Sequence, residues 1–102
     1  MLWKIKQLIL KGDYWFTDKA LSEMYVSGIT KEDVLEAIIN AHGINKVLKT
    51  TSRGKTHKGE RIYVIYGFTY DNILLYTKGT IKITDGEETM YRLISAKREG
   101  IF

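Results

Sequence analysis

The spacing of apolar residues changes partway along the chain, from a helical period to the two-residue period of a β-strand. Up to residue 40, apolar side chains recur every three or four positions, as they do on one face of an α-helix. From Arg61 onwards they either alternate or fill both faces of extended segments. Helices followed by strands in a chain of 102 residues predict the α+β class, with residues 1–102 forming a single domain.

Local signals at the helix ends support the periodicity. Thr17 is a candidate N-cap, and Thr30 with Asp33 forms the pattern of a capping box. Gly12 and Gly28 are natural stops, because glycine readily adopts the left-handed conformation that ends a helix. Three helices are therefore predicted, over residues 2–11, 17–28 and 30–40.

The second part of the chain predicts a small, mainly antiparallel sheet, with strands over residues 44–50, 61–69, 73–83 and 90–97. The strand over 61–69 barely alternates, so both of its faces should be covered, and Tyr63 and Tyr66 are expected in the core. The next strand alternates, with Tyr76, Lys78 and Lys82 on its polar face. The alternation of the last strand is too poor to assign its faces. We expect the helices on one face of the sheet and a binding surface on the other.

Basic residues gather in the later part of the chain. Residues 1–45 contain five Lys or Arg and six Asp or Glu, a net charge of −1, whereas residues 46–102 contain eleven and six, a net charge of +5. This asymmetry indicates an anionic partner, either a nucleic acid or an acidic protein surface.

Composition excludes other classes of site. Cysteine is absent and only two histidines occur, so we expect no disulfide, no metal site and no cofactor. No apolar run is as long as a membrane span, and the first residues lack a signal-peptide cleavage site. We therefore expect a cytoplasmic protein with no membrane partner.

The densest basic stretch runs from Lys46 to Arg61, directly before two segments that contain tyrosines. Cations beside aromatic rings suit a ligand with both phosphates and flat bases, so RNA is the first candidate. A polar loop of this kind is more often a simple solvated connection, and that alternative stays open. The residues expected to bind RNA are Lys49, Arg53, Lys55, Lys58, Arg61, Lys78, Lys82 and Arg98.

The same residue types suit metal-free cleavage of RNA. In that reaction a base removes the proton of the 2′-hydroxyl group, an acid protonates the leaving 5′-oxygen, and cations stabilise the charged phosphorane. His57 or a tyrosine can transfer protons here, and the positive neighbours of His57 disfavour its protonated form, which suits a base but is equally true of an idle histidine. His42 is expected to complement a helix end rather than to act in catalysis.

Several short strings, in this order, resemble one known family. They are residues 5–12, Phe16-Thr17 with Ala20-Leu21, Gly28-Ile29, residues 34–39, residues 45–51, and Leu93-Ile94-Ser95-Ala96-Lys97. Together they resemble the MqsR-like mRNA interferases, toxins of the RelE-like superfamily found in bacterial toxin–antitoxin pairs. The FT-x-x-A-L and ISAKRE strings also resemble the small BrnT-type toxins, whose pattern has His at the position of Lys19.

The resemblance implies a RelE-like fold and the toxin of a type II pair. Its activity would be that of a metal-independent endoribonuclease that cleaves single-stranded mRNA, on or off the ribosome. Its partner would be a cognate antitoxin, of a zinc-finger or helix-turn-helix type. The resemblance places Lys46 and Lys97 at basic catalytic positions and a sheet tyrosine, Tyr76 ahead of Tyr63, at the position of the hydroxyl group. His57 is added from its chemistry and not from the resemblance, so the candidate catalytic set is Lys46, Tyr76, Lys97 and His57.

An alternative from the residues alone is a non-catalytic module that binds RNA or an acidic protein through the same basic face. A structural protein with no nucleic-acid role is a third hypothesis. For the first two we expect Lys46, Arg61 or Lys97 to converge on the polar face of the strand over 73–83, since scattered charges cannot focus a field.

Overall fold

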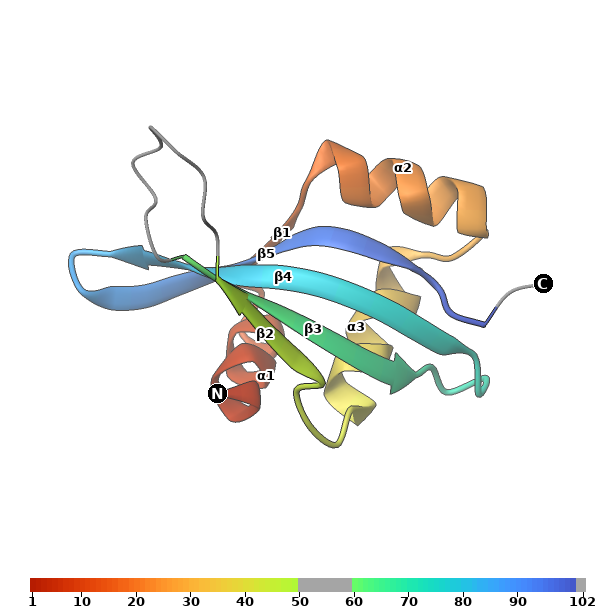
Figure 1. Ribbon diagram of the computed structural model, residues 1–102, viewed down its shortest axis with the longest axis horizontal. Coiled ribbons are helices and arrows are strands. Elements are labelled where there is room, and N and C mark those ends of the chain that lie inside the picture. The colour runs from red at the N-terminus through yellow and green to blue at the C-terminus, as the bar shows by residue number, and fades with distance from the viewer. Residues whose placement is uncertain (50–59, 101–102) are drawn as a thin grey trace.

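A computed structural model describes residues 1–49 and 60–100 of the chain. The elements of this part are α1 Leu2–Leu10, β1 Tyr14–Phe16, α2 Asp18–Ser27, α3 Lys31–Asn40, β2 Lys46–Lys49, β3 Arg61–Phe68, β4 Leu74–Thr84 and β5 Glu87–Arg98. The strands form one sheet in the order β1-β5-β4-β3-β2, with the helices packed against it (Figure 1). The α+β class is confirmed.

The helices begin and end where their caps predict. The Thr17 hydroxyl accepts a hydrogen bond from the Ala20 amide at the start of α2, and Gly28 closes that helix with φ of 71°. Thr30 and Asp33 form the reciprocal bonds of a capping box at the start of α3. Each cap satisfies amides that the first turn of a helix leaves without partners.

Neighbouring strands are antiparallel except for β1, which pairs parallel with β5. The sequence predicts the four longer strands but misses β1, whose three residues are too few to show a period. Backbone hydrogen bonds of 3.0 Å hold β1 in place, from the Tyr91 amide to the Asp13 carbonyl and from the Thr17 amide to the Leu93 carbonyl. The sheet is therefore mixed.

The core lies between the sheet and the helices α1 and α3, and Ala20 and Met24 of α2 extend it. Its most deeply buried side chains come from both layers and include Ile5, Val34, Ile38, Ile65, Leu75 and Leu93. At Gly67 of β3 the helix α3 comes so close that a Cβ atom would collide with the backbone of Ala37. The opposite side of the sheet faces the viewer in Figure 1 with no described helix over it, and we call it the open face.

Helix α2 lies along the outer edge of β5 (Figure 1). Its side chains bond to the backbone groups that β5 turns away from β4. The Thr17 hydroxyl donates to the Ile94 carbonyl (3.3 Å), and the Arg98 amide donates to the Ser27 hydroxyl (3.3 Å). The helix thereby takes the place of a further strand, because it satisfies edge groups that a sheet otherwise pairs.

No helix in residues 1–49 and 60–100 is long and apolar enough to cross a membrane.

Candidate functional site

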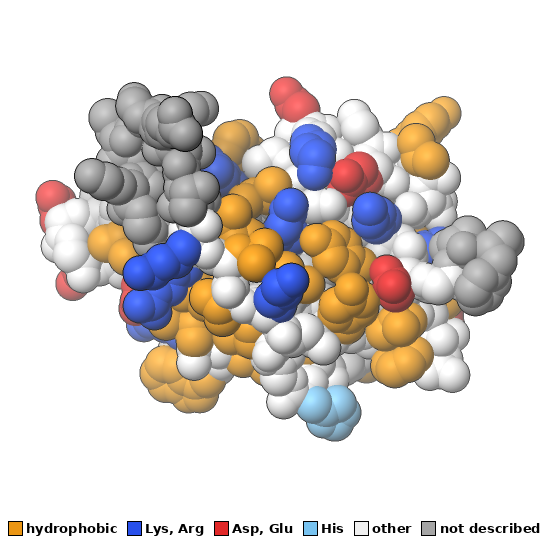
Figure 2. All heavy atoms as spheres, viewed as in Figure 1, with side chains coloured by type: hydrophobic (Ala, Val, Ile, Leu, Met, Phe, Trp, Pro, Cys, Tyr) orange, Lys and Arg blue, Asp and Glu red, His pale blue; other side chains and the backbone are white. Residues whose placement is uncertain are grey.

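Strand register brings several of the predicted residues into two adjacent rows on the open face. Lys46, Val64, Lys78 and Ser95 lie opposite one another across β2, β3, β4 and β5. Tyr66, Tyr76 and Lys97 form the neighbouring row across β3, β4 and β5. Paired residues of neighbouring strands share a face, so both rows face the same way. Figure 2 shows this side of the molecule, with separate basic side chains set among hydrophobic ones.

The second row is joined by ring contacts. The rings of Tyr66 and Tyr76 meet edge to face, with centroids 5.4 Å apart and planes at 74°. The Lys97 ammonium lies over the ring of Tyr76, with Nζ 5.4 Å from its centroid. A cation at this distance is attracted to the negative face of the ring. Lys97 thus lies beside Tyr76, another residue of the candidate catalytic set.

The hydroxyl group of Tyr76 keeps its proton. Burial, reinforced by Tyr66, Glu23 and Glu99, raises the pKa of Tyr76 above its usual value of about 10. A phenol with a raised pKa is protonated at neutral pH and donates hydrogen bonds. In a reaction it acts as an acid rather than as a base.

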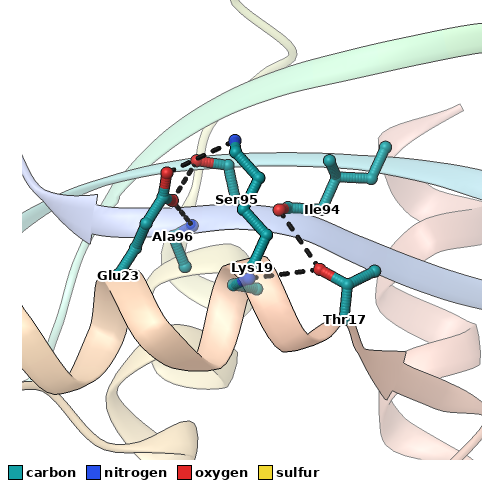
Figure 3. Close-up of polar contacts among 7 residues, drawn as sticks. Thr17, Lys19, Glu23, Ile94, Ser95 and Ala96 are labelled. Atoms are coloured by element: carbon teal, nitrogen blue, oxygen red, sulfur yellow. Dashed lines mark hydrogen bonds and ion pairs between the residues drawn. The ribbon is translucent and has the colours of Figure 1, made fainter.

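Glu23 of α2 stands beside this row and makes three contacts, two with β5 and one within α2 (Figure 3). One carboxylate oxygen accepts from the Ser95 hydroxyl and from the Ala96 amide (3.1 Å), and the other lies 3.3 Å from Lys19 Nζ. Partial burial opposes the charge of Glu23, but the bonds from Ser95, Lys19 and Ala96 outweigh it and lower the pKa of the carboxyl group. Glu23 is therefore ionised at neutral pH.

The structure divides the predicted residues between the two sides of the sheet. Lys46, Tyr76, Lys78 and Lys97 lie on the open face. Lys82 continues the same alternation of β4, beyond the point where β3 begins. Lys49 pairs with Arg61, two positions along from the pair of Val47 with the core residue Tyr63. Arg98 pairs with Leu75, which is also in the core. Lys49, Arg61 and Arg98 therefore lie on the side of the sheet that faces the core. Arg53, Lys55, His57 and Lys58 lie outside the described residues.

The other aromatic and histidine predictions have mixed outcomes. Tyr63 is buried as expected, but Tyr66 is only partly buried and belongs to the open face. His42 is exposed beyond the last residue of α3. In residues 1–49 and 60–100, no group of three or more His, Asp or Glu side chains could hold a metal ion.

Sequence reasoning missed Glu23 and Ser95. The spacing of Lys19 and Glu23 by four residues indicates a charge pair on a helix, and that was the available signal. The partner Ser95 lies 72 residues further on, so only the fold shows that the carboxylate turns toward β5.

No protein-family model matches the chain, and comparison with curated proteins finds no match. Its function therefore has to be argued from the open face itself.

Proposed function

We propose that the open face binds single-stranded RNA and cleaves it without a metal ion, and that the chain acts as the toxin of a type II toxin–antitoxin pair. The observation that carries the proposal is the contact of Lys97 with Tyr76, in a row beside Lys46 and Lys78. A proton donor and several cations on one sheet face suit a phosphodiester substrate.

Binding to this face would use both components of a nucleotide. Lys46, Lys78 and Lys97 attract phosphates, and each neutralised phosphate releases counterions. The rings of Tyr66 and Tyr76 offer apolar surface on which bases stack, and stacking of this kind accepts any base. The combination favours single strands, whose bases are free to leave the helical stack.

In the proposed reaction the 2′-oxygen attacks the adjacent phosphorus and the bond to the 5′-oxygen breaks. The Tyr76 hydroxyl protonates the departing 5′-oxygen, and Lys97 stabilises the negative charge that builds up on the phosphorane. The 2′-hydroxyl proton passes to a base, for which the sequence offers His57, outside the described residues. The products carry a 2′,3′-cyclic phosphate and a 5′-hydroxyl group.

The toxin role rests on the resemblance to MqsR-like and BrnT-type proteins over short strings of the sequence. The toxin role implies that expression of the chain in a cell arrests growth and that a cognate antitoxin relieves the arrest. Replacement of Lys97 by alanine should relieve the arrest as well, because it removes a group that the cleavage step needs.

The decisive test compares two neighbouring residues on opposite sides of the sheet. Lys97→Ala should lower the rate of RNA cleavage about a hundredfold, the cost of roughly 3 kcal/mol for losing one electrostatic contact to the transition state. Arg98→Ala, which removes a cation from the other side, should leave the rate nearly unchanged. Tyr76→Phe keeps the ring beneath Lys97 but has no proton to donate, so it should cleave slowly while still binding RNA.

The assay uses purified protein, chelator and a labelled single strand, with and without ribosomes, and identifies the ends of the products. Equal losses for Lys97→Ala and Arg98→Ala would refute the assignment of the site. If the protein binds RNA but leaves it intact, the result would instead support a second candidate function, which is binding without cleavage.

That second candidate is a module that binds RNA without cutting it. Glu23 favours it, since both oxygens of this carboxylate are engaged by Ser95, Ala96 and Lys19. A carboxylate held in this way is a poor proton acceptor. If no other base serves the site, the open face binds and releases its ligand unchanged.

A further inference from the structure

Beside Tyr66 the open face is hollowed, where the segment between α3 and β2 passes the end of β3. The hollow has a volume of about 260 Å³. Its lining comes from the segment 40–45, from residues 66–68 at the end of β3 and from Leu74 of β4. This is smaller than the ~300–1,000 Å³ of pockets for drug-sized ligands, so the hollow suits a ligand no larger than one ring system.

The apolar lining comes from the end of the sheet. Phe68 of β3 lies opposite Leu74 of β4, and both share the open face with Tyr66. Phe68 is 49% exposed, so its ring is accessible to a ligand. An exposed aromatic ring beside a second one is a surface on which a planar ligand can stack.

Two amide side chains of the lining are fixed by bonds to the strand. Asn40 donates through Nδ2 to the Phe68 carbonyl, and Asn45 accepts through Oδ1 from the Tyr66 amide, both at 2.9 Å. The remaining amide atoms are an acceptor, Asn40 Oδ1, and a donor, Asn45 Nδ2. In the part of the chain that the structure describes, neither has a protein partner. An oriented donor and acceptor are what the hydrogen-bonding edge of a nucleobase requires.

We infer that this hollow holds one unstacked nucleobase of the bound strand, with the next phosphate toward Lys46. The inference rests on the proposed function, because it takes the ligand to be RNA on the open face. It adds a subsite for one base of the single strand, and that base must present a free pairing edge. Tyr66 joins the two parts of the site, since its ring lines the hollow and also meets Tyr76.

The test removes one side chain of the hollow and no charge. Phe68→Ala takes away a wall that is half exposed, and Tyr70→Ala is its control, because Tyr70 is nearby in sequence, 73% exposed and outside the lining. Two ligands of equal length are compared. One is a short 2′-O-methyl RNA, which cannot be cut by attack of its own 2′-hydroxyl group, and the other is the same backbone with hydrogen in place of every base.

We expect Phe68→Ala to weaken binding of the RNA about 5- to 100-fold, the range for loss of one stacked base. It should leave binding of the base-free strand unchanged, and Tyr70→Ala should bind both strands as the wild type does. Thermal unfolding of each variant checks that the fold is intact.

Other results separate the two proposals. If Phe68→Ala binds RNA as tightly as Tyr70→Ala does, or weakens both strands equally, the hollow is not a base site. Should Lys78→Ala still weaken both strands in that case, the open face remains the RNA surface. A wild-type protein that binds neither strand would overturn the proposed function and the base site together.

Discussion

Glu23 joins two parts of the chain, because its carboxylate gathers the Ser95 hydroxyl, the Ala96 amide and the Lys19 ammonium. These contacts exist for the ionised form of the group and are weakened in the protonated one. A charge held by hydrogen bonds in this way links the stability of the fold to pH.

The pH dependence has a definite direction. The pKa of the Glu23 carboxyl group is lower in the folded chain than the usual value of about 4.3 for glutamate. Its stabilisation is therefore fully present above pH ~4.3 and is lost as the pH falls through the lower folded pKa. Glu23→Gln should lower the free energy of unfolding by on the order of 1 kcal/mol at neutral pH, after allowance for partial solvent exposure.

Urea unfolding at a series of pH values measures this effect. The gap between wild type and Glu23→Gln should close as the pH approaches 3, whereas Glu87→Gln, at the exposed first residue of β5, should show little gap at any pH. A gap that stays constant from pH 7 to 3 would mean that the charge of Glu23 contributes nothing.

For single residues, the sequence predicted the sheet face of some side chains and not of others. Alternation in β4 places Tyr76 and Lys78 on one face, as the structure has them. The face of Lys97 could not be predicted, because the register of β5 shifts twice, next to Ile94 and next to Thr89. Each shift adds a residue that has no partner and reverses the alternation after it.

At the scale of elements, local rules decide the helices and long-range contacts decide how they pack. The caps at Thr17 and Thr30 lie within a few residues of the groups they bind, so the sequence alone locates both helix starts. The position of α2 beside β5 depends on bonds between residues about 70 positions apart. No local pattern carries that information.

Packing of α3 on β3 makes one glycine indispensable. A methyl group at Gly67 would meet the Ala37 backbone, which cannot move without shifting the helix. Gly67→Ala should cost about 1–3 kcal/mol of unfolding free energy or more. Gly43→Ala, where a Cβ atom meets nothing within 4 Å, should stay within about 0.5 kcal/mol of the wild type. Chemical denaturation compares them, and equal stability of the two variants would contradict the close approach.

At the scale of the whole molecule, the net charge of +4 is less informative than its division between the sides of the sheet. Lys46 and Lys78 lie on the open face, while Lys49 and Arg61 lie on the other. If the open face binds RNA as proposed, the phosphates contact the first pair and not the second. The sequence showed the excess of charge, but only strand register sorts its members.

The salt dependence of RNA binding tests whether lysines on the two sides of the sheet differ in their contact with the ligand. The logarithm of the affinity should fall linearly with the logarithm of salt concentration, and Lys46→Ala or Lys78→Ala should each reduce the slope by about 0.7, as expected for one phosphate of a single strand. Lys49→Ala should leave the slope nearly unchanged. Equal changes for Lys49→Ala and Lys78→Ala would show that the ligand does not distinguish the two sides of the sheet.

The edge formed by α2 also limits how this protein can associate with itself. A β-sheet grows into a fibre by adding strands at both of its margins, and each addition needs unpaired amides and carbonyls. Along the later part of β5 those groups already bond to Thr17, Glu23 and Ser27. The earlier part is covered by β1, which is only three residues long and offers little template. In the described part of the chain, the other edge strand, β2, is then the place where a strand of a second molecule can add. Two molecules joined through their β2 strands leave no second edge of this kind, so the sheet does not grow into a fibre.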